Sequence, residues 1–256
     1  MLLVIDVGNT NISLGLMQGN EVIGSFRLTT KTPRTSDEFG LCIKELLDMT
    51  KLQNDDIEAV IISSVVPKIM YSLTSAIVKF LHKDPIIVGP GIKTGISIRT
   101  DNPREVGADR IVDISMAYHT YHKSCIIVDF GTATTFDYIS GEGVFKYTVI
   151  APGLGIVANA LTSQTAKLPE IEIQKPESIL NGNTITGMQA GVIYGYIGSV
   201  EYIIKQMKKE LKLKDCLVIA TGGLGKVIAK ETKEIDLFDP DVAYKGMRIL
   251  YDLNKK

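Results

Sequence analysis

The fold is decided by the stretch Ile126-Ile-Val-Asp129-Phe-Gly131-Thr-Ala-Thr-Thr135, which repeats the pattern of Leu2-Leu-Val-Ile-Asp6-Val-Gly8-Asn-Thr-Asn11. Each stretch is an apolar run that ends in Asp-x-Gly and continues with small hydroxyl or amide residues. Short apolar runs followed by turn residues are typical of buried strands. Asp129 follows Asp6 by 123 residues, almost half of the 256-residue chain, so the spacing indicates an internal duplication.

The residues that follow each stretch extend the repeat. After the first, Ile12 to Met17 and Glu21 to Leu28 are predicted strands, with Gly19-Asn20 as the turn between them. After the second, Phe136 to Ile139 and Glu142 to Ile150 supply the corresponding pair. Each half of the chain is therefore predicted to begin with an antiparallel meander of three strands.

Strands and helices alternate after each meander, which indicates α/β layers. The predicted elements are a helix from Ser36, a strand from Ala59 to Ser63, a helix after Pro67, a strand from Ile86 to Val88, a helix from Thr184 to Leu211, a strand from Cys216 to Ala220 and a helix from Asp241 to Leu253. We expect an α/β protein of two duplicated domains, residues 1–118 and 119–256. Each would be a mixed sheet flanked by helices, with a cleft between them.

The charge balance disfavours some classes of partner. Twenty-eight Lys and Arg residues face 29 Asp and Glu residues, which leaves a net charge of −1. Proteins that coat nucleic acid or anionic membranes need a basic excess, so we expect neither partner. The absence of Trp and the 7% aromatic content leave little from which to build a base-stacking platform.

The expected lack of targeting signals and the pattern of cysteines indicate a cytoplasmic protein. The N-terminus lacks a basic region and carries a charge at Asp6, so we expect no signal peptide, and no apolar run approaches the ~20 residues of a membrane helix. Cys42, Cys125 and Cys216 are far apart and form no Cys-x-x-Cys pair. This pattern fits reduced thiols, and we expect Cys125 and Cys216 to be small buried hydrophobic residues.

The Asp-x-Gly turns carry groups that suit phosphate binding. Gly8 allows the backbone to approach a phosphate closely and tolerates a positive φ, while Asn9, Thr10 and Asn11 add hydrogen-bond donors. Asp6 is a candidate ligand for hydrated Mg²⁺. A single copy would be interpreted as an ordinary hairpin turn, but two copies in register behind apolar strands favour a phosphate site.

Further segments agree with this interpretation and point to one family. They are Asn102-Pro-Arg-Glu-Val-Gly-Ala-Asp-Arg110, Ile150-Ala-Pro-Gly153, Asn183-Thr184 with Met188-Gln-Ala-Gly191, and Thr221-Gly-Gly223. The first is the most specific, because neither turn formation nor core packing demands it. Together with the Asp-x-Gly stretches, these segments resemble type III pantothenate kinases, in the acetate-and-sugar-kinase, heat-shock-protein-70 and actin superfamily, over essentially the whole chain.

The resemblance implies an actin-like (ribonuclease H-like) fold for each half and ATP-dependent phosphorylation of pantothenate, the first step of coenzyme A synthesis. It implies that Asp109 is the general base and that Gly107, Ala108 and Arg110 line the pantothenate pocket. The first phosphate loop would consist of Asp6, Val7, Gly8, Asn9, Thr10, Asn11, Ile12 and Ser13. Without its flanking motif, Asp109-Arg110 would be interpreted as a surface ion pair.

The second half would complete the site. By the same resemblance, Thr132 would contact the ATP phosphates, Thr184 the substrate, and Asp129 a monovalent cation, K⁺ or NH₄⁺. Gly222 and Gly223 would lie beside adenosine, although capping of a helix explains this turn equally well. The family usually forms a homodimer with the pocket near the interface, and we carry that expectation over.

The chain departs from the family pattern at two places. Thr100 stands where the family often has a substrate-contacting Tyr, and Tyr147-Thr148 replaces the usual Gly-Gly. Both changes bear on substrate affinity and turnover. Asp6, Asp109 and Asp129 are all present, so the chemical core matches the family.

Other motifs have simpler explanations. Gly153-Leu-Gly155-Ile-Val-Ala158 matches a dinucleotide-binding pattern, but the preceding strand leaves a meander instead of opening a βαβ unit. The stretch from Thr221 to Val227 resembles the end of a P-loop without its first Gly and its final Ser or Thr. His119 and His122 have a spacing that could share a metal, yet no nearby carboxylate or cysteine completes a site, so exposed or partner-facing histidines are expected.

Three functional alternatives stay open beside the pantothenate kinase. One is a related actin-fold kinase for another hydroxy acid or sugar, which Thr100 keeps open. The second is a catalytically weak homologue. The third is an accessory regulatory protein, because members of this family have been labelled as accessory transcriptional activators; neither the net charge nor any helix-turn-helix supports DNA binding.

Overall fold

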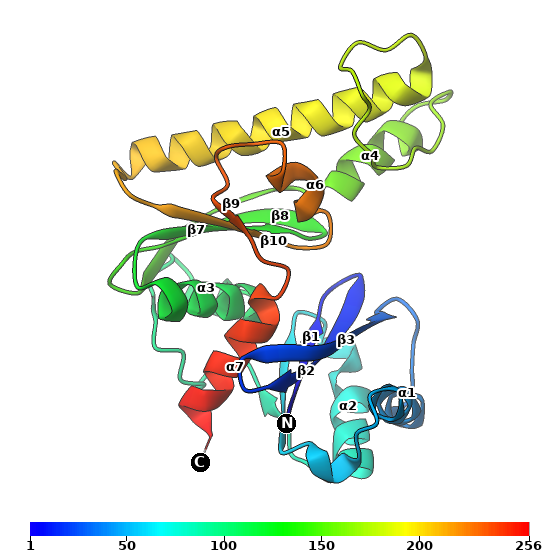
Figure 1. The fold of residues 1–256 in the computed structure, drawn as a ribbon, viewed down its shortest axis with the longest axis vertical. Coiled ribbons are helices and arrows are strands. Elements are labelled where there is room, and N and C mark those ends of the chain that lie inside the picture. Colours follow the sequence, from blue (N-terminus) through cyan, green and yellow to red (C-terminus); the bar gives the residue numbers. More distant parts are fainter. Residues whose placement is uncertain (256) are drawn as a thin grey trace. The chain divides into compact units, whose positions relative to one another are not determined.

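The computed structural model describes residues 1–255. The chain divides into two compact units: unit 1 comprises Met1–Thr120 and Asp241–Lys256, and unit 2 comprises Tyr121–Pro240. Each unit is a sheet flanked by helices (Figure 1). The sequence-based division placed the last helix with the second half, whereas this helix, α7 (Val242–Asn254), packs on β1, β2 and β4 of unit 1.

The sheet of unit 1 has the strand order β3-β2-β1-β4-β5. Its strands are β1 (Leu2–Val7), β2 (Asn11–Gln18), β3 (Glu21–Thr29), β4 (Ala59–Ser64) and β5 (Ile86–Ile87). β1, β2 and β3 pair antiparallel, and β4 and β5 continue the sheet in the parallel sense. The predicted meander is confirmed.

Helices cover both faces of this sheet, and local sequence signals set where they begin. They are α1 (Ser36–Met49), α2 (Pro67–Ala76), α3 (Ala108–Tyr121) and α7. α1 begins after Thr35, whose side chain accepts from Glu38 N while the Glu38 carboxylate accepts from Thr35 N, a reciprocal cap that satisfies two otherwise unpaired donors. α2 begins at Pro67, which lacks the N–H that the first helical turn cannot use.

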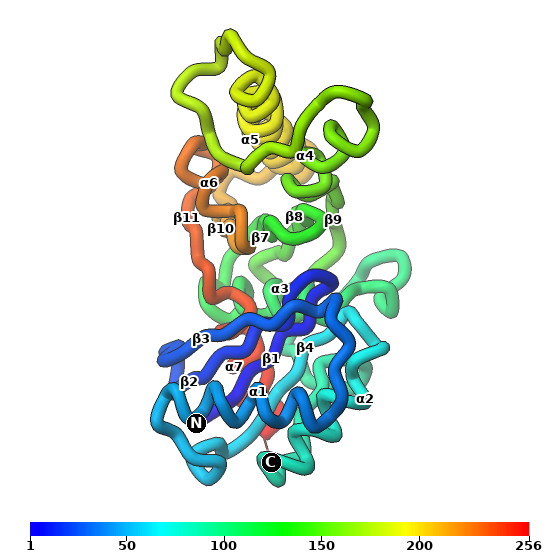
Figure 2. Tube along the Cα trace, turned by 90° about the vertical axis from the view of Figure 1, so that its right-hand side faces the viewer, coloured from blue at the N-terminus to red at the C-terminus, as the bar shows by residue number. Residues whose placement is uncertain are grey.

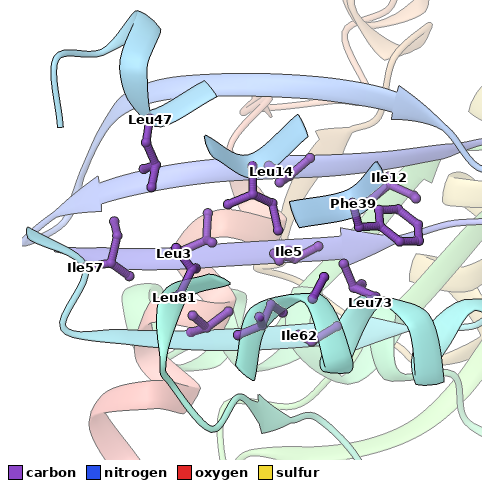
Figure 3. Packing of buried hydrophobic residues seen from close by; sticks show 14 of the residues in the cluster. Leu3, Ile5, Ile12, Leu14, Phe39, Leu47, Ile57, Ile62, Leu73 and Leu81 are labelled. Atoms are coloured by element: carbon purple, nitrogen blue, oxygen red, sulfur yellow. The ribbon is translucent and has the colours of Figure 1, made fainter. Parts of the chain in front are cut away.

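Alternate residues of β1 serve two different cores. Leu3, Ile5 and Val7 pack with residues of α1 and α2 such as Phe39 and Leu73 (Figure 3). Leu2 and Val4 point the other way and pack with residues of α3 and α7. This period of two is the ordinary geometry of a strand, and it places Asp6 on the α3 and α7 face.

The strands of unit 2 follow the order β11-β10-β7-β8-β9. They are β7 (Cys125–Phe130), β8 (Ala133–Ile139), β9 (Val144–Pro152), β10 (Leu217–Thr221) and β11 (Leu237–Phe238). β7, β8 and β9 pair antiparallel, while β10 and β11 are parallel to β7. In the same order, unit 1 has β5, β4, β1, β2 and β3, so the predicted duplication is confirmed strand by strand.

A long helix covers one face of the unit 2 sheet. The helices of unit 2 are α4 (Leu154–Ser163), α5 (Thr184–Glu210) and α6 (Gly225–Ala229). α5 runs along the sheet in Figure 1 and is seen nearly end-on in Figure 2, and its Ile193, Val200 and Ile204 are buried with Val128 and Phe136. Within residues 1–255, no helix is both long and apolar enough to cross a bilayer.

Close contact between α3 and α7 depends on a glycine and gives a stability prediction. A Cβ at Gly246 would lie 2.3 Å from Val112 O and 2.7 Å from Val112 Cγ1. We expect Gly246→Ala to lower the free energy of unfolding by about 2–3 kcal/mol, because overpacking outweighs the gain in helix propensity. A Cβ added at Gly155 in α4 (Leu154–Ser163) would meet nothing within 4 Å, so Gly155→Ala should raise stability by up to about 1 kcal/mol. Urea unfolding of both variants checks the pair, and equal midpoints would contradict the packing argument.

Candidate active site

The first Asp-x-Gly turn is a short loop that joins β1 to β2. Gly8 N donates to Asn11 O over 2.9 Å, and Thr30 holds the loop from outside, with Thr30 Oγ1 donating to Gly8 O (2.7 Å) and Thr30 N donating to Thr10 O (2.9 Å). Asn9, Thr10 and Asn11 are exposed. Gly8 does not have the positive φ that the sequence argument allowed for. What a glycine offers here is the lack of a side chain, which lets the backbone approach a phosphate closely.

Polar residues form a row across the sheet at the end of β1. Asp6 pairs with Ser13 of β2 on one side and with Ser63 of β4 on the other, so their side chains share the α3 and α7 face. Ser63 is fully buried and Asp6 is partly buried. Burial, followed by the charge of Asp109, raises the pKa of Asp6 to about 7, and the Ser63 hydroxyl acts in the opposite direction. The structure thus places Asp6 close enough to Asp109 for the two carboxyl groups to interact.

Asp109 lies in the first turn of α3, and the preceding motif shapes its surroundings. Asn102 opens the 3₁₀ turn Pro103–Glu105, accepting from Arg104 N and donating to Glu105 Oε1 (2.6 Å). Asp109 Oδ1 accepts from Arg110 N over 2.8 Å, and a Cβ at Gly107 would lie 2.4 Å from this oxygen. Any side chain at Gly107 would therefore displace the carboxylate.

The neighbouring candidate substrate residues also lie in unit 1. Ala108 and Arg110 are partly buried in the first turn of α3. Thr100 Oγ1 is buried with no hydrogen-bond partner among the described residues. An unsatisfied buried hydroxyl is uncommon in proteins, so Thr100 offers a polar group that a bound substrate could satisfy.

The second Asp-x-Gly turn joins β7 to β8 and is packed under α4. A Cβ at Gly153 would lie 2.2 Å from Thr132 O and 2.5 Å from Gly131 O. Gly153 is the N-cap residue of α4, and β9, which precedes it, is antiparallel to β8. The dinucleotide pattern at Gly153 therefore marks a helix start that is packed against the Gly131-Thr132 loop.

The Thr221-Gly-Gly223 turn meets the end of β7. Thr221 pairs with Asp129 across the sheet. Gly222 has φ +93°, and a Cβ there would lie 2.6 Å from both Asp129 Oδ1 and Phe130 O. A carboxylate and a carbonyl oxygen therefore converge on a space that only glycine leaves open. Oxygen donors of this kind suit a hard cation.

Two further residues singled out from the sequence come from α5 and β9. Thr184 is the first residue of α5, after the N-cap Asn183, and is exposed. Tyr147 is 45% exposed, with Lys146 Nζ 5.0 Å from its ring centroid, so in this chain the residue does not fill a buried space. Among residues 1–255, no three His, Cys, Asp or Glu side chains gather into a metal-binding group.

Some expectations for single residues were wrong. His119 is partly buried and its Nε2 lies 2.9 Å from Thr94 O, so of the two expected settings the exposed one does not apply to it; His122 is exposed as expected. Cys125 is buried, as predicted, whereas Cys216 is only partly buried. Burial raises the pKa of the Cys125 thiol to about 12 and that of Cys216 to about 11, which disfavours the reactive thiolate form of both.

Sequence reasoning missed residues that surround Asp6. Ser63 was interpreted only as the end of a strand, although a Ser-Ser pair closing a buried apolar strand is a usable signal. Tyr244 comes from α7, and its hydroxyl donates to Leu14 O over 3.5 Å. No local pattern connects Tyr244 to β2, because the two are 230 residues apart in sequence.

The raised pKa of Asp6 predicts a pH-dependent stability difference. A carboxyl group whose pKa is higher in the folded than in the unfolded state makes the folded state less stable as the pH rises between the two values. For Asp6 the stabilising contribution is complete below pH 3.8 and is lost as the pH rises to about 7. Asp6→Asn removes that loss, so we expect the variant to be more stable than wild type at pH 8 by about 2–4 kcal/mol, and by little at pH 4. The measurement is urea unfolding across this pH range in metal-free buffer.

Glu38 supplies a control of opposite sign for this experiment. Hydrogen bonds from Thr35 lower the pKa of Glu38, so its stabilising contribution is present above pH 4.5 and is lost as the pH falls through its folded pKa. Glu38→Gln should therefore be less stable than wild type at pH 8. If the stability of Asp6→Asn relative to wild type does not increase with pH, Asp6 is not the buried carboxyl group beside Asp109 that is described above.

Comparison with known proteins now identifies the family. A sequence profile described as type III pantothenate kinase matches residues 2–206. The chain belongs to the type III pantothenate kinase family. The type III pantothenate kinase of Agathobacter rectalis is 51% identical over 98% of this chain and 96% of its own length, and that of Bifidobacterium longum is 49% identical over the full length of both. The resemblance inferred from the motifs is confirmed.

Solved structures at low sequence identity support the fold. A protein described as a 2-dehydro-3-deoxygalactonokinase from Sinorhizobium meliloti has a TM-score of 0.64 at 10% identity, covering 100% of this chain and 98% of its own. A protein described as a Baf family transcriptional activator from Campylobacter jejuni has a TM-score of 0.58 at 19% identity, covering 98% of both chains. The predicted class, two mixed sheets flanked by helices in the manner of actin-like sugar kinases, is confirmed.

Proposed function

We propose that this chain transfers the γ-phosphoryl group of ATP to the hydroxyl of pantothenate, giving 4′-phosphopantothenate and ADP, the first step of coenzyme A synthesis. The observation that best supports this proposal is the pair of interacting carboxyl groups, Asp6 and Asp109, with Asp6 at the start of the exposed first Asp-x-Gly turn. The chain that carries them is 51% identical to a type III pantothenate kinase. Phosphoryl transfer depends mainly on positioning and on charge neutralisation, and these residues supply both.

Asp109 is the group we assign to the substrate hydroxyl. Its carboxylate accepts the hydroxyl proton as the substrate oxygen bonds to the γ-phosphorus and the bond from that phosphorus to the β-phosphate oxygen breaks. The N-terminus of α3 and the hydrogen bond from Arg110 N hold the carboxylate in place. Gly107, Ala108, Arg110 and the unpartnered Thr100 hydroxyl are proposed to surround pantothenate, with Thr184 as a further contact.

The loops are assigned to ATP. Backbone N–H groups and side chains of the first loop, from Asp6 to Ser13, would donate to phosphate oxygens, and Thr132 would do so from the second loop. Gly222 and Gly223 are proposed to lie beside adenosine, because Gly223 has nothing within 4 Å of a Cβ position and leaves room for a flat ring.

The residues present fit two cations. Burial and then repulsion from Asp109 raise the pKa of Asp6, and Mg²⁺ held through water by Asp6 would relieve the repulsion. Bound Mg²⁺ would neutralise charge on the transferring phosphates. Asp129 Oδ1 and Phe130 O, which converge beside Gly222, are the donors that we assign to K⁺ or NH₄⁺.

Two further features belong to the same proposal. We propose a homodimer, supported by the face of α5 that carries Gly187, Gly191 and Gly195, where nothing lies within 4 Å of any Cβ position. We propose a cytoplasmic location, supported by free thiols at Cys42, Cys125 and Cys216.

The test is steady-state turnover of ATP with pantothenate, with and without K⁺ or NH₄⁺, alongside panels of sugars and other hydroxy acids. Turnover with pantothenate that depends on the monovalent cation is the expected result. Turnover with another polyol and none with pantothenate would transfer the function to a related actin-fold kinase. A chain that binds ATP but turns over no substrate would be a catalytically weak or regulatory homologue.

A further inference from the structure

Arg27 of β3 lies in the same cross-strand row as Asp6. Arg27 pairs with Ser13, and Ser13 pairs with Asp6, so the register places the three residues side by side on adjacent strands. Side chains that are directly opposite on neighbouring strands project from the same face of a sheet. Arg27 therefore extends from the face that carries Asp6, one strand beyond the residue that closes the first phosphate loop.

The contacts around Tyr244 support this orientation. Tyr244 comes from α7, and its ring would lie 3.0 Å from a Cβ at Gly15 of β2. Burial raises the pKa of Tyr244, while the positive charge of Arg27 lowers it and the negative charge of Asp6 raises it. Both charged groups thus act on a phenol packed on this face, in agreement with the register that places Arg27 and Asp6 on one side of the sheet.

Arg27 is exposed, and no carboxylate of the described residues forms a salt bridge with it. An exposed guanidinium without an acidic partner keeps its donors available for a ligand. Planar guanidinium groups match phosphate oxygens with two parallel hydrogen bonds. The nearby carboxyl groups of Asp6 and Asp109 alone would repel a polyphosphate, so a cation in this row complements them.

We propose that Arg27 is a phosphate-binding residue that contacts the triphosphate of ATP beside the first loop. The inference rests on the proposed function for the identity of the nucleotide, but its test does not require turnover. Arg27 is assigned to binding and charge neutralisation, whereas Asp109 is assigned to the hydroxyl proton.

The experiment compares Arg27→Ala, Arg27→Lys and Lys44→Ala in the full-length protein. Lys44 is an exposed cation on α1, so its removal changes the net charge equally. Calorimetric titration with a non-hydrolysable ATP analogue and Mg²⁺ should show affinity at least 10-fold weaker for Arg27→Ala, partly restored in Arg27→Lys and unchanged in Lys44→Ala. In turnover assays the KM for ATP should rise while the KM for pantothenate stays within about 2-fold.

The outcomes separate this inference from the proposed function. If the wild type binds the analogue but does not phosphorylate pantothenate, the proposed function fails and the titration still decides the role of Arg27. Affinity within 2-fold of wild type in Arg27→Ala overturns the inference. No nucleotide binding by wild type overturns both. Thermal unfolding of each variant checks that a loss of affinity does not come from unfolding.

Discussion

Asp109→Asn should lower kcat with pantothenate by at least about 100-fold, the order expected when a general base and positioning group is lost. Asparagine keeps an oxygen that can accept from Arg110 N, so the helix start should survive the change. The variant removes a negative charge that raises the pKa of Asp6, so its stability should equal or exceed that of wild type at pH 8. Steady-state kinetics together with urea unfolding checks both statements.

Asp101→Asn is the matched control for this prediction. Asp101 is exposed, precedes the Asn102 turn and carries the same charge. We expect its kcat to stay within about 2-fold of wild type. A KM for ATP that is unchanged in Asp109→Asn would locate the loss in the chemical step instead of nucleotide binding. Activity of Asp109→Asn close to wild type would remove Asp109 from the mechanism.

Much of the fold could be predicted because its signals are local and repeated. The apolar run before each Asp-x-Gly turn identifies a central strand, and the meander after it follows from alternating residues and turn chemistry. The repeat then gave the second unit from the first. Element bounds agree to within a few residues, as for the helix predicted from Thr184 to Leu211 and observed over Thr184–Glu210.

The division of the chain could not be predicted in the same way. The last helix follows the second unit in sequence, yet α7 buries Tyr244, Met247 and Leu250 against β-strand residues such as Val4 in unit 1. Its amphipathic pattern shows that it packs on an apolar surface but does not say on which one. The unit on which α7 packs is decided by contacts between residues far apart in sequence, and no local pattern reveals these contacts.

The candidate site shows the same limit. Glycines and acids in motifs could be found from the sequence, because their residue types at those spacings are chemically distinctive. Ser63 and Arg27 carry no motif, and they become site residues only through the strand register that sets them beside Asp6 and Ser13. Register depends on the pairing of whole strands, so it is visible only in the folded sheet.

Gly222→Ala should lower the free energy of unfolding by about 2–4 kcal/mol, through a left-handed backbone strain and a steric clash. Gly222 has φ +93°, and the added Cβ would lie 2.6 Å from Asp129 Oδ1 and from Phe130 O. Phe130 O is a backbone atom, so it cannot move aside as the end of a flexible side chain could. The methyl would also crowd the two oxygens that we assign to the monovalent cation. Activation by K⁺ should therefore be lost at protein concentrations and temperatures where the variant is still folded.

Gly223→Ala separates these causes because it changes the adjacent residue. Gly223 has no positive φ and nothing within 4 Å of a Cβ position, so its variant should unfold within about 1 kcal/mol of wild type. If Gly223 lies beside adenosine as proposed, the methyl should weaken nucleotide affinity while K⁺ activation persists. Urea unfolding, and nucleotide titration with and without K⁺, distinguish the two variants. A Gly222→Ala protein as stable as wild type and still activated by K⁺ would rule out the oxygen cradle at Asp129, because the same methyl group cannot be accommodated there without displacing its donors.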